Sequence, residues 1–109
     1  MLLKVGRHLR PKAHYKLIVG REAGENNYLS GYRHDFITIS PISHNGPLTL
    51  IDGVPTADDI REAAAIAARF SQGREADLVE LEVCQPGKPA ERLKVRPFST
   101  SEVLQEWYV

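Results

Sequence analysis

The sequence predicts an α+β fold: a single domain over residues 1–109, in which a mixed or antiparallel sheet of about six strands is packed by one long alanine-rich helix and one or two short helices. Three observations support this prediction. A chain of 109 residues is long enough for a single hydrophobic core. Several short stretches alternate apolar and polar residues, which is typical of strands. One stretch, residues 56–73, has helical periodicity and a capping residue at its start.

Two strands are expected near the N-terminus, at residues 2–5 and 15–19, and they could pair as a hairpin. A basic connection that contains Pro11 separates them. The next stretch, residues 22–30, mixes polar and apolar residues. Four of its members share a helical spacing: Ala23, Asn26, Asn27 and Ser30. This stretch therefore predicts a short helix.

Two more strands are expected at residues 35–39 and 48–51, where apolar and β-branched residues dominate. The segment between them is SPISHNGP, at residues 40–47. Its two prolines and its Asn-Gly pair predict an exposed loop.

The clearest helix is TADDIREAAAIAARFSQG, at residues 56–73. Thr56 is a favourable N-cap, Asp58 and Asp59 lie in the positively polarised first turn, and Gly73 lies just past the end. The residues of one stripe are expected to face the sheet, and most of them are small: Ile60, Ala63, Ala64, Ala67, Phe70 and Ser71. Such a helix packs closely on a sheet.

A late hairpin is expected because residues 78–83 and 93–96 alternate and the turn QPGKPAE lies between them. After Pro97, Ser99 and Glu102 form a capping-box pattern, which predicts a short closing helix.

Several classes of protein are not indicated by the composition. No apolar run approaches the length of a membrane span, so no membrane partner is expected, and the first ten residues lack the apolar core of an export signal. The single cysteine, Cys84, cannot form an internal disulfide. We therefore expect a reduced, cytoplasmic setting.

The net charge is zero, but the charges are unevenly distributed along the chain. Residues 1–35 hold seven Lys and Arg against three Asp and Glu, whereas residues 36–109 hold seven against eleven. Such asymmetry can mark an anion-binding face. The alternative is that the two halves neutralise each other across the fold.

No catalytic or metal site is indicated. No serine stands in a Gly-x-Ser-x-Gly elbow, and the four histidines lack metal-ligand spacing. A small enzyme would require His34, Asp35 and His44 to converge in one pocket. We therefore expect no catalytic residue, no metal and no cofactor.

The stretch VGR, residues 19–21, indicates an anion site. Gly20 lets backbone or ligand approach closely, Arg21 offers a fork of donors that fits a phosphate, and the helix that follows presents its N-terminus to the same place. The alternative is that Gly20 marks a bulge and that Arg21 pairs with a structural carboxylate such as Asp35.

Two amides and several rings lie close to this stretch. Asn26 and Asn27 could read base or ribose edges, because an amide presents both a donor and an acceptor; they could equally be helix-surface or capping residues. Arg21 and Arg33 are interleaved with aromatic residues, a combination that holds unpaired RNA: Tyr15, Tyr28, Tyr32 and Phe36. Several of these rings are alternatively core residues.

Taken together and in order, these motifs resemble the NFACT-R domain, an RNA-binding module. In that family a Val-Gly-Arg strand end is followed five residues later by Asn and then, three residues on, by Leu; here these are Arg21, Asn26 and Leu29. An Asp opens the next strand, here Asp35. The resemblance covers about residues 15–85.

The long helix extends the resemblance, and the neighbouring strands depart from it. The family's helix carries Ala-Ala and ends in Tyr/Phe-Ser, here Ala63-Ala64 and Phe70-Ser71. The family has an aromatic residue and a His after the Asp, and a Gly-Ser-His at the later strand. This chain has DFITI and NGPLTLI instead, so the details of the family's contacts do not carry over.

The resemblance implies a non-catalytic RNA-binding domain, with tRNA the favoured ligand. One branch of the family is appended to PP-loop ATPases that resemble tRNA thiouridine synthases, and the opening LLKVGRH resembles the continuation of a longer chain. This implies service to a tRNA-modification enzyme of the thiolation type, with a PP-loop domain as partner in cis or in trans.

The residues expected to contact RNA fall into two groups. The phosphate group comprises Arg21, the Gly20 backbone, Lys16, Arg7 and Arg33. The sugar and base group comprises Asn26, Asn27 and Tyr28. The alternative to RNA binding is a protein-docking domain that tethers a PP-loop catalytic partner through its alanine-rich helix or its acidic late hairpin.

Overall fold

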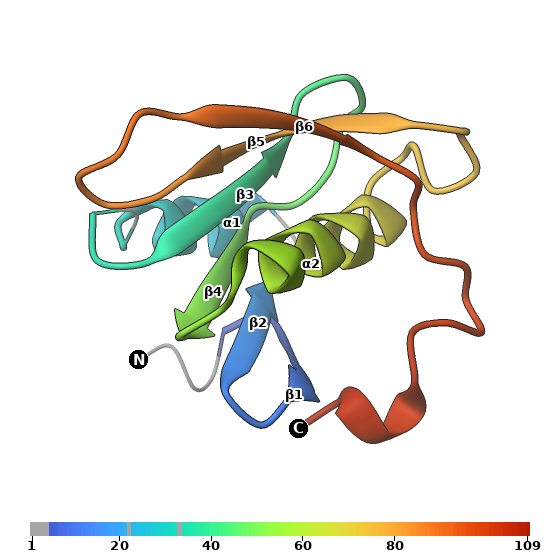
Figure 1. Ribbon diagram of the computed structural model, residues 1–109, viewed down its shortest axis with the longest axis horizontal. Helices are drawn as coiled ribbons and strands as arrows, with labels where there is room; N and C mark the ends of the chain where they lie inside the picture. Colours follow the sequence, from blue (N-terminus) through green and yellow to red (C-terminus); the bar gives the residue numbers. More distant parts are fainter. Residues whose placement is uncertain (1–4, 22, 33) are drawn as a thin grey trace.

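Six strands pair into one antiparallel sheet in the order β1-β2-β4-β3-β5-β6 in the computed structural model, which describes residues 5–21, 23–32 and 34–109 (Figure 1). The strands are β1 (Arg7–Lys12), β2 (Tyr15–Val19), β3 (Ile37–Pro41), β4 (Thr49–Gly53), β5 (Val79–Cys84) and β6 (Glu91–Val95). The helices are α1 (Ala23–Ser30), α2 (Ala57–Arg69) and the 3-10 helix η2 (Gln105–Trp107). The predicted α+β class is confirmed, and the sheet is antiparallel.

The first hairpin differs from the prediction. Of the strand expected at residues 2–5, residues 2–4 lie outside the described residues, and Val5 lies in a bend. The segment predicted to be a basic connection is itself the strand β1, so that prediction was wrong. Pro11 is tolerated because β1 is an edge strand and its register shifts between Leu9 and Lys12.

The middle of the chain follows the prediction closely. The short helix expected at residues 22–30 is α1, and the strand expected at residues 48–51 is β4, which starts at Thr49. The strand β3 begins two residues later than expected, at Ile37, because the backbone N–H groups of Asp35 and Phe36 donate to the Tyr32 carbonyl in a turn.

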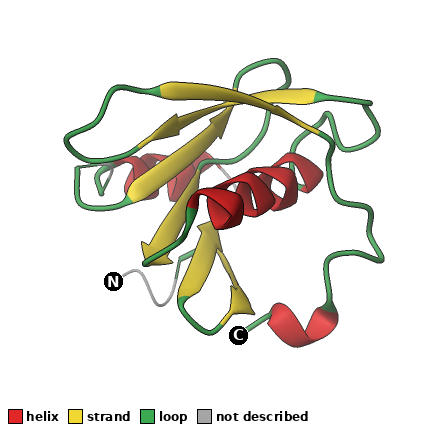
Figure 2. Cartoon of the chain, viewed as in Figure 1, coloured by secondary structure: helices red, strands yellow, loops and turns green. Residues whose placement is uncertain are grey.

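Helix α2 begins with the expected N-cap. The Thr56 hydroxyl accepts from the Asp59 N–H at 3.1 Å, and the Asp59 carboxylate accepts from the Thr56 N–H at 2.9 Å, which completes a capping box. The alanines that follow are buried where the sheet curls around α2 (Figures 1 and 2). Their small side chains let the helix pack closely against the strands.

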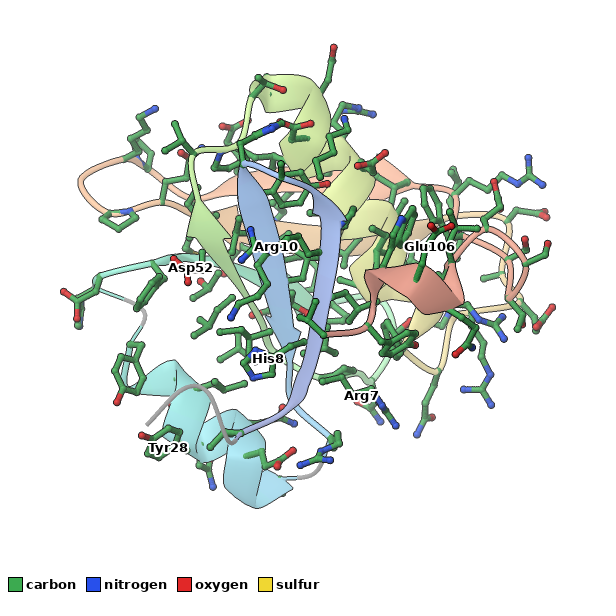
Figure 3. All side chains as sticks on the ribbon, turned by 90° about the horizontal axis from the view of Figure 1, so that it is seen from below. Arg7, His8, Arg10, Tyr28, Asp52 and Glu106 are labelled. Atoms are coloured by element: carbon green, nitrogen blue, oxygen red, sulfur yellow. The ribbon has the colours of Figure 1, made fainter. Side chains whose placement is uncertain are left out.

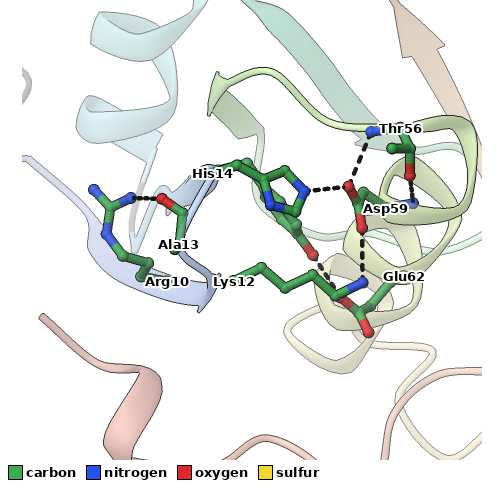
Figure 4. Close-up of polar contacts among 8 residues, drawn as sticks. Arg10, Lys12, Ala13, His14, Thr56, Asp59 and Glu62 are labelled. Carbon is green, nitrogen blue, oxygen red and sulfur yellow. Dashed lines mark hydrogen bonds and ion pairs between the residues drawn. The ribbon is translucent and has the colours of Figure 1, made fainter.

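Asp59 also attaches the first hairpin to α2. Its carboxylate accepts hydrogen bonds from Lys12 Nζ at 2.7 Å and His14 Nε2 at 2.6 Å, and the Tyr15 hydroxyl donates to Glu62 at 2.6 Å (Figure 4). The Asp59 side chain is almost fully buried. Part of the basic N-terminal charge is therefore neutralised by the acidic half of the chain, as the second interpretation of the charge asymmetry predicted.

The two helices cover opposite faces of the sheet. Leu17 and Val19 of β2 belong to the main core with α2, whereas Ile18 packs with Leu29 of α1 and with Leu50 in a second, smaller cluster. Every residue of β2 is therefore buried. This arrangement places the start of α1 directly beside the end of β2.

The C-terminal part has the expected hairpin, β5–β6, and a closing turn that differs from the prediction. The Ser99 N–H donates to Glu102 Oε1 at 2.8 Å, as in a capping box, but these residues form a turn, and the short helix is the 3-10 helix η2. Within the described residues, neither α1 nor α2 has the length and apolar character that a membrane span requires.

Candidate nucleic-acid interface

A hollow of about 240 Å³ lies where the end of β2, the start of α1, the loop before β4 and the end of α2 meet. We call it the Gly-Arg hollow. Its lining comes from both halves of the chain: Arg7, Gly20, Arg21, Asn26, Asn45, Gly46, Pro47, Phe70 and Gln72. Four of the eight residues predicted to contact RNA are among them, and no Asp or Glu is among these lining residues.

Gly20 and Asn26 fit together at the base of the hollow. A Cβ on residue 20 would lie 1.9 Å from Asn26 Oδ1, so only glycine leaves room for the amide. That oxygen accepts from the Leu48 N–H at 3.2 Å, while the Gly20 N–H donates to the Leu48 carbonyl at 3.0 Å. The Asn26 oxygen and the Gly20 N–H are thus used in joining α1 and β2 to the segment before β4. Gly20 therefore provides space for the Asn26 amide, and its N–H is bonded to Leu48 rather than directed at a ligand.

Arg21 forms a bidentate ion pair with Glu25 in the first turn of α1. The distances are 3.1 Å from Nε to Oε1 and 2.9 Å from Nη2 to Oε2, and the Arg21 backbone N–H also donates to Oε1 at 2.9 Å. A structural carboxylate was one of the two predicted alternatives for Arg21, but the acid is Glu25 and not Asp35. Half of the Arg21 side chain remains exposed, so the guanidinium is not sealed inside.

The hydrogen bonds from Arg21 determine the charge of this acid. Bonds from the Arg21 side chain, followed by the bond from its backbone N–H, lower the pKa of Glu25 to about 2. Glu25 is therefore ionised at neutral pH. The sequence predicted a bound anion at the N-terminus of α1. The ionised carboxylate of Glu25, a residue of the chain itself, occupies that position.

Arg7, the first residue of β1, also lines the hollow; its side chain is labelled in Figure 3. Its guanidinium carbon lies 5.2 Å from the centre of the Phe70 ring, a cation–π contact that orients the charge at the end of α2. The Arg7 residue is exposed.

The other wall of the hollow, formed by the loop before β4 and the end of α2, was not predicted from the sequence. The Gln72 N–H donates to the Asn45 carbonyl at 2.7 Å, and a Cβ on Gly46 would lie 2.7 Å from the Cβ of Ser71. The loop predicted only as exposed is therefore attached to the end of α2. A glycine inside that loop was the one available signal, because glycine permits such close approach.

The remaining predicted residues do not line the Gly-Arg hollow. Lys16 lies within β2 and is only 9% exposed, which leaves little of it for a ligand. Asn27 and Tyr28 are exposed on α1; the Tyr28 hydroxyl lies 3.1 Å from that of Tyr32, and Tyr28 stands apart from Arg7 (Figure 3). Arg33 lies outside the described residues.

The residues considered for an enzyme are not brought together around His44. His44 lines a shallow hollow with Ile42, Ser43, Asn45 and Gln72, and neither His34 nor Asp35 is among its lining residues. In the described part of the chain, no three His, Cys, Asp or Glu side chains are grouped so that they could hold a metal ion.

Comparisons with known proteins bear on the family and on the fold of this chain. The profile of the NFACT protein RNA binding domain matches residues 6–108. Among solved structures, the C-terminal of the fibronectin/fibrinogen-binding protein from Streptococcus suis aligns with a TM-score of 0.76 at 18% sequence identity, a likeness of fold. The alignment covers 96% of this chain and 50% of that one, so this chain spans about half of that structure. No curated protein matches the sequence.

The profile match extends well beyond residues 15–85, which carried the resemblance, and includes all six strands of the described sheet. The chain therefore belongs to the NFACT protein RNA binding domain family, a family of RNA-binding and not of catalytic domains.

Proposed function

We propose that this chain binds tRNA through the Gly-Arg hollow. It would serve, without catalytic residues of its own, as the RNA-binding domain of a cytoplasmic tRNA-modification enzyme of the thiolation type. A PP-loop ATPase domain, in cis or in trans, would supply the chemistry. RNA binding is supported by membership of the family. The tRNA ligand and the PP-loop partner rest on the resemblance to the branch that is appended to such enzymes.

The observation that carries the proposal is the meeting of Arg7 and Arg21 at one hollow. Arg7 is the first residue of β1, Arg21 lies between the end of β2 and the start of α1, and none of the residues that line the hollow is acidic. Arginine binds phosphate through a planar fork of donors and stays charged at any physiological pH. Phosphate contacts of this kind supply most of the affinity for nucleic acid, and the sugar or base contacts assigned to Asn27 and Tyr28 add selectivity.

Fluorescence anisotropy of the chain with tRNA, single-stranded RNA and duplex DNA across a salt series tests this function. We expect tRNA to bind most tightly. The logarithm of its affinity should fall linearly with the logarithm of salt concentration, with a slope of about −0.7 to −0.9 for each phosphate contacted. An affinity that is unchanged between low and moderate salt would contradict the proposal. Co-purification with a PP-loop enzyme without any RNA affinity would favour the docking alternative.

Arg21→Gln tests the site itself. Loss of a charge-assisted bond to phosphate should weaken tRNA binding about tenfold. The matched control is Arg92→Gln, which removes the same charge from an exposed position of β6 outside the Gly-Arg hollow. Equal affinity of the two variants would remove Arg21 from the site, and a loss of folding in circular dichroism would make Arg21 a structural residue.

Glu25→Gln provides the opposite change at the same place. Because ionised Glu25 holds both the side chain and the backbone N–H of Arg21, it competes with phosphate for these donors. Removal of its charge should raise the affinity for tRNA several-fold. A lower affinity would mean that the ion pair positions Arg21 for RNA.

A further inference from the structure

We propose that a second hollow, next to the Gly-Arg hollow, binds a further nucleotide of the same RNA strand. This inference rests on the proposed RNA binding. The second hollow has a volume of about 330 Å³, and we call it the Arg74 hollow. Three arginines and two aromatic rings are prominent in its lining: Arg7, Arg69, Arg74, Phe70 and Tyr108.

The two hollows share part of their walls. Arg7 and Phe70 line both of them, and the Arg7 guanidinium lies over the Phe70 ring at their junction. A polymer bound in one hollow is therefore adjacent to the other, and Arg7 is placed to contact the phosphate between two neighbouring nucleotides.

The charge of the Arg74 hollow favours an anion. Its lining residues include three arginines and no Asp or Glu. Arg69 is held by Thr100, to which its guanidinium donates, and by Glu75 at 3.4 Å. The Glu75 side chain is 86% exposed, so water screens its interaction with Arg69. Glu75 therefore offsets little of the positive charge that Arg69 presents to the hollow. Arg74 is itself exposed.

The aromatic residues distinguish a nucleotide from a simple anion. The Tyr108 residue is 40% exposed, and its backbone is fixed because it bridges Leu9 of β1 and donates to the Gln105 carbonyl at 3.2 Å. An aromatic ring that lines a hollow together with guanidinium groups offers a surface on which an unpaired base can stack. The Arg74 hollow thus offers cations for a phosphate and a ring for a base.

A third and larger hollow adjoins the Arg74 hollow. It has a volume of about 680 Å³ and shares Arg69, Arg74 and Thr100 with the Arg74 hollow. Arg96 is added to its lining, but so are Glu75 and Asp77, which offset two of its three arginines. We therefore assign the nucleotide to the Arg74 hollow.

Two variants separate the two contacts, each measured by anisotropy with single-stranded RNA across a salt series. Arg74→Gln should weaken binding and reduce the salt slope by about 0.7, the value for one phosphate of a single strand. Tyr108→Leu should leave the slope unchanged and weaken binding at least about fivefold. The charge control is Arg92→Gln at an exposed position of β6, because Arg92 lines neither hollow.

An RNA that lacks bases tests the stacking contact directly. With abasic RNA, Tyr108→Leu should bind as tightly as the unmodified chain, because no base remains to stack. The inference is overturned if Arg74→Gln has the same salt slope as Arg92→Gln. It is also overturned if Tyr108→Leu loses as much affinity for abasic RNA as for ordinary RNA. In both cases RNA binding by the unmodified chain still stands. If the unmodified chain binds no RNA, the proposed function and the inference both fail.

Discussion

Gly20 and Asn26, six positions apart, act as one structural unit at the residue scale. The absent side chain of Gly20 makes room for the Asn26 amide, whose oxygen accepts from the Leu48 N–H. The Gly-Arg motif, which indicated an anion site in the sequence, thus also has a structural role. It joins α1 and the residue after β2 to the segment before β4.

Gly20→Ala should destabilise the fold. The added Cβ would lie 1.9 Å from Asn26 Oδ1, so the amide or the whole of α1 must move. Overpacking of this kind costs about 1–3 kcal/mol. Urea unfolding followed by circular dichroism measures the change in the free energy of unfolding.

Gly24→Ala is the matched control, since an added Cβ there meets nothing within 4 Å. Gly24 lies within α1, where alanine is favoured over glycine by about 0.5–1 kcal/mol. This variant should therefore be slightly more stable. Equal destabilisation by both substitutions would mean that Gly20 is not limited by contact with Asn26.

At the scale of elements, Asp59 joins the first hairpin to the first turn of α2. Hydrogen bonds from Lys12, then from His14, and then from the Thr56 N–H hold the pKa of Asp59 well below its usual range. Because the pKa is depressed in the folded protein, this carboxylate contributes stability that is fully present above its ordinary value of 3.8. The contribution is lost as pH falls below that value toward the folded pKa.

Asp59→Asn should lower the melting temperature at neutral pH and flatten the loss of stability in acid. The control is Asp58→Asn, an exposed neighbour in the same helical turn, which should change both quantities less. Melting temperatures measured from neutral pH down to about pH 2 test both expectations. Parallel acid profiles for Asp59→Asn and the unmodified chain would exclude Asp59 as a source of the acid sensitivity.

At the scale of the whole molecule, the two faces of the sheet are unequally supported. Within the described residues, seventeen buried side chains form the main core around α2, and three form the cluster beneath α1: Ile18, Leu29 and Leu50. The Gly-Arg hollow therefore lies partly on the less strongly supported element. Local opening of α1 can occur without unfolding of the main core.

Hydrogen exchange measures this difference. The amides of α1 should exchange faster than those of α2 and with a weaker dependence on urea, because α1 opens locally. Leu29→Ala, which empties a fully buried site, should accelerate exchange in α1 far more than in α2. A common exchange rate and a common urea dependence for both helices would contradict this picture.

Local patterns in the sequence predicted much of the fold. Thr56 and Asp59 specify the start of α2 through contacts three residues apart, and the alternation in residues 78–83 specifies β5, because both signals are read within one element. The strand β1 was missed because Pro11 is disfavoured in the interior of a sheet. Only the placement of β1 at an edge makes that proline acceptable.

The candidate site was predictable only in part. The sequence indicated Gly20 and Arg21, whose roles follow from their neighbours along the chain. It missed Phe70 and Arg74, which join Arg7 only because the end of α2 lies beside the start of β1. Lys16 illustrates the converse, since both faces of β2 are covered and its charge is almost wholly buried.

The sequence by itself determined the α+β class, the capped alanine-rich helix and the Gly-Arg motif, because each of these depends on residues that interact along one short stretch. Only the tertiary structure decided which charges meet. Lys12 is neutralised by Asp59 of α2, to which His14 is also hydrogen-bonded, whereas Arg7 comes to lie beside arginines from the acidic half of the chain. The physical reason is that Coulomb interactions depend on distance in space, and strand order, not sequence order, sets that distance.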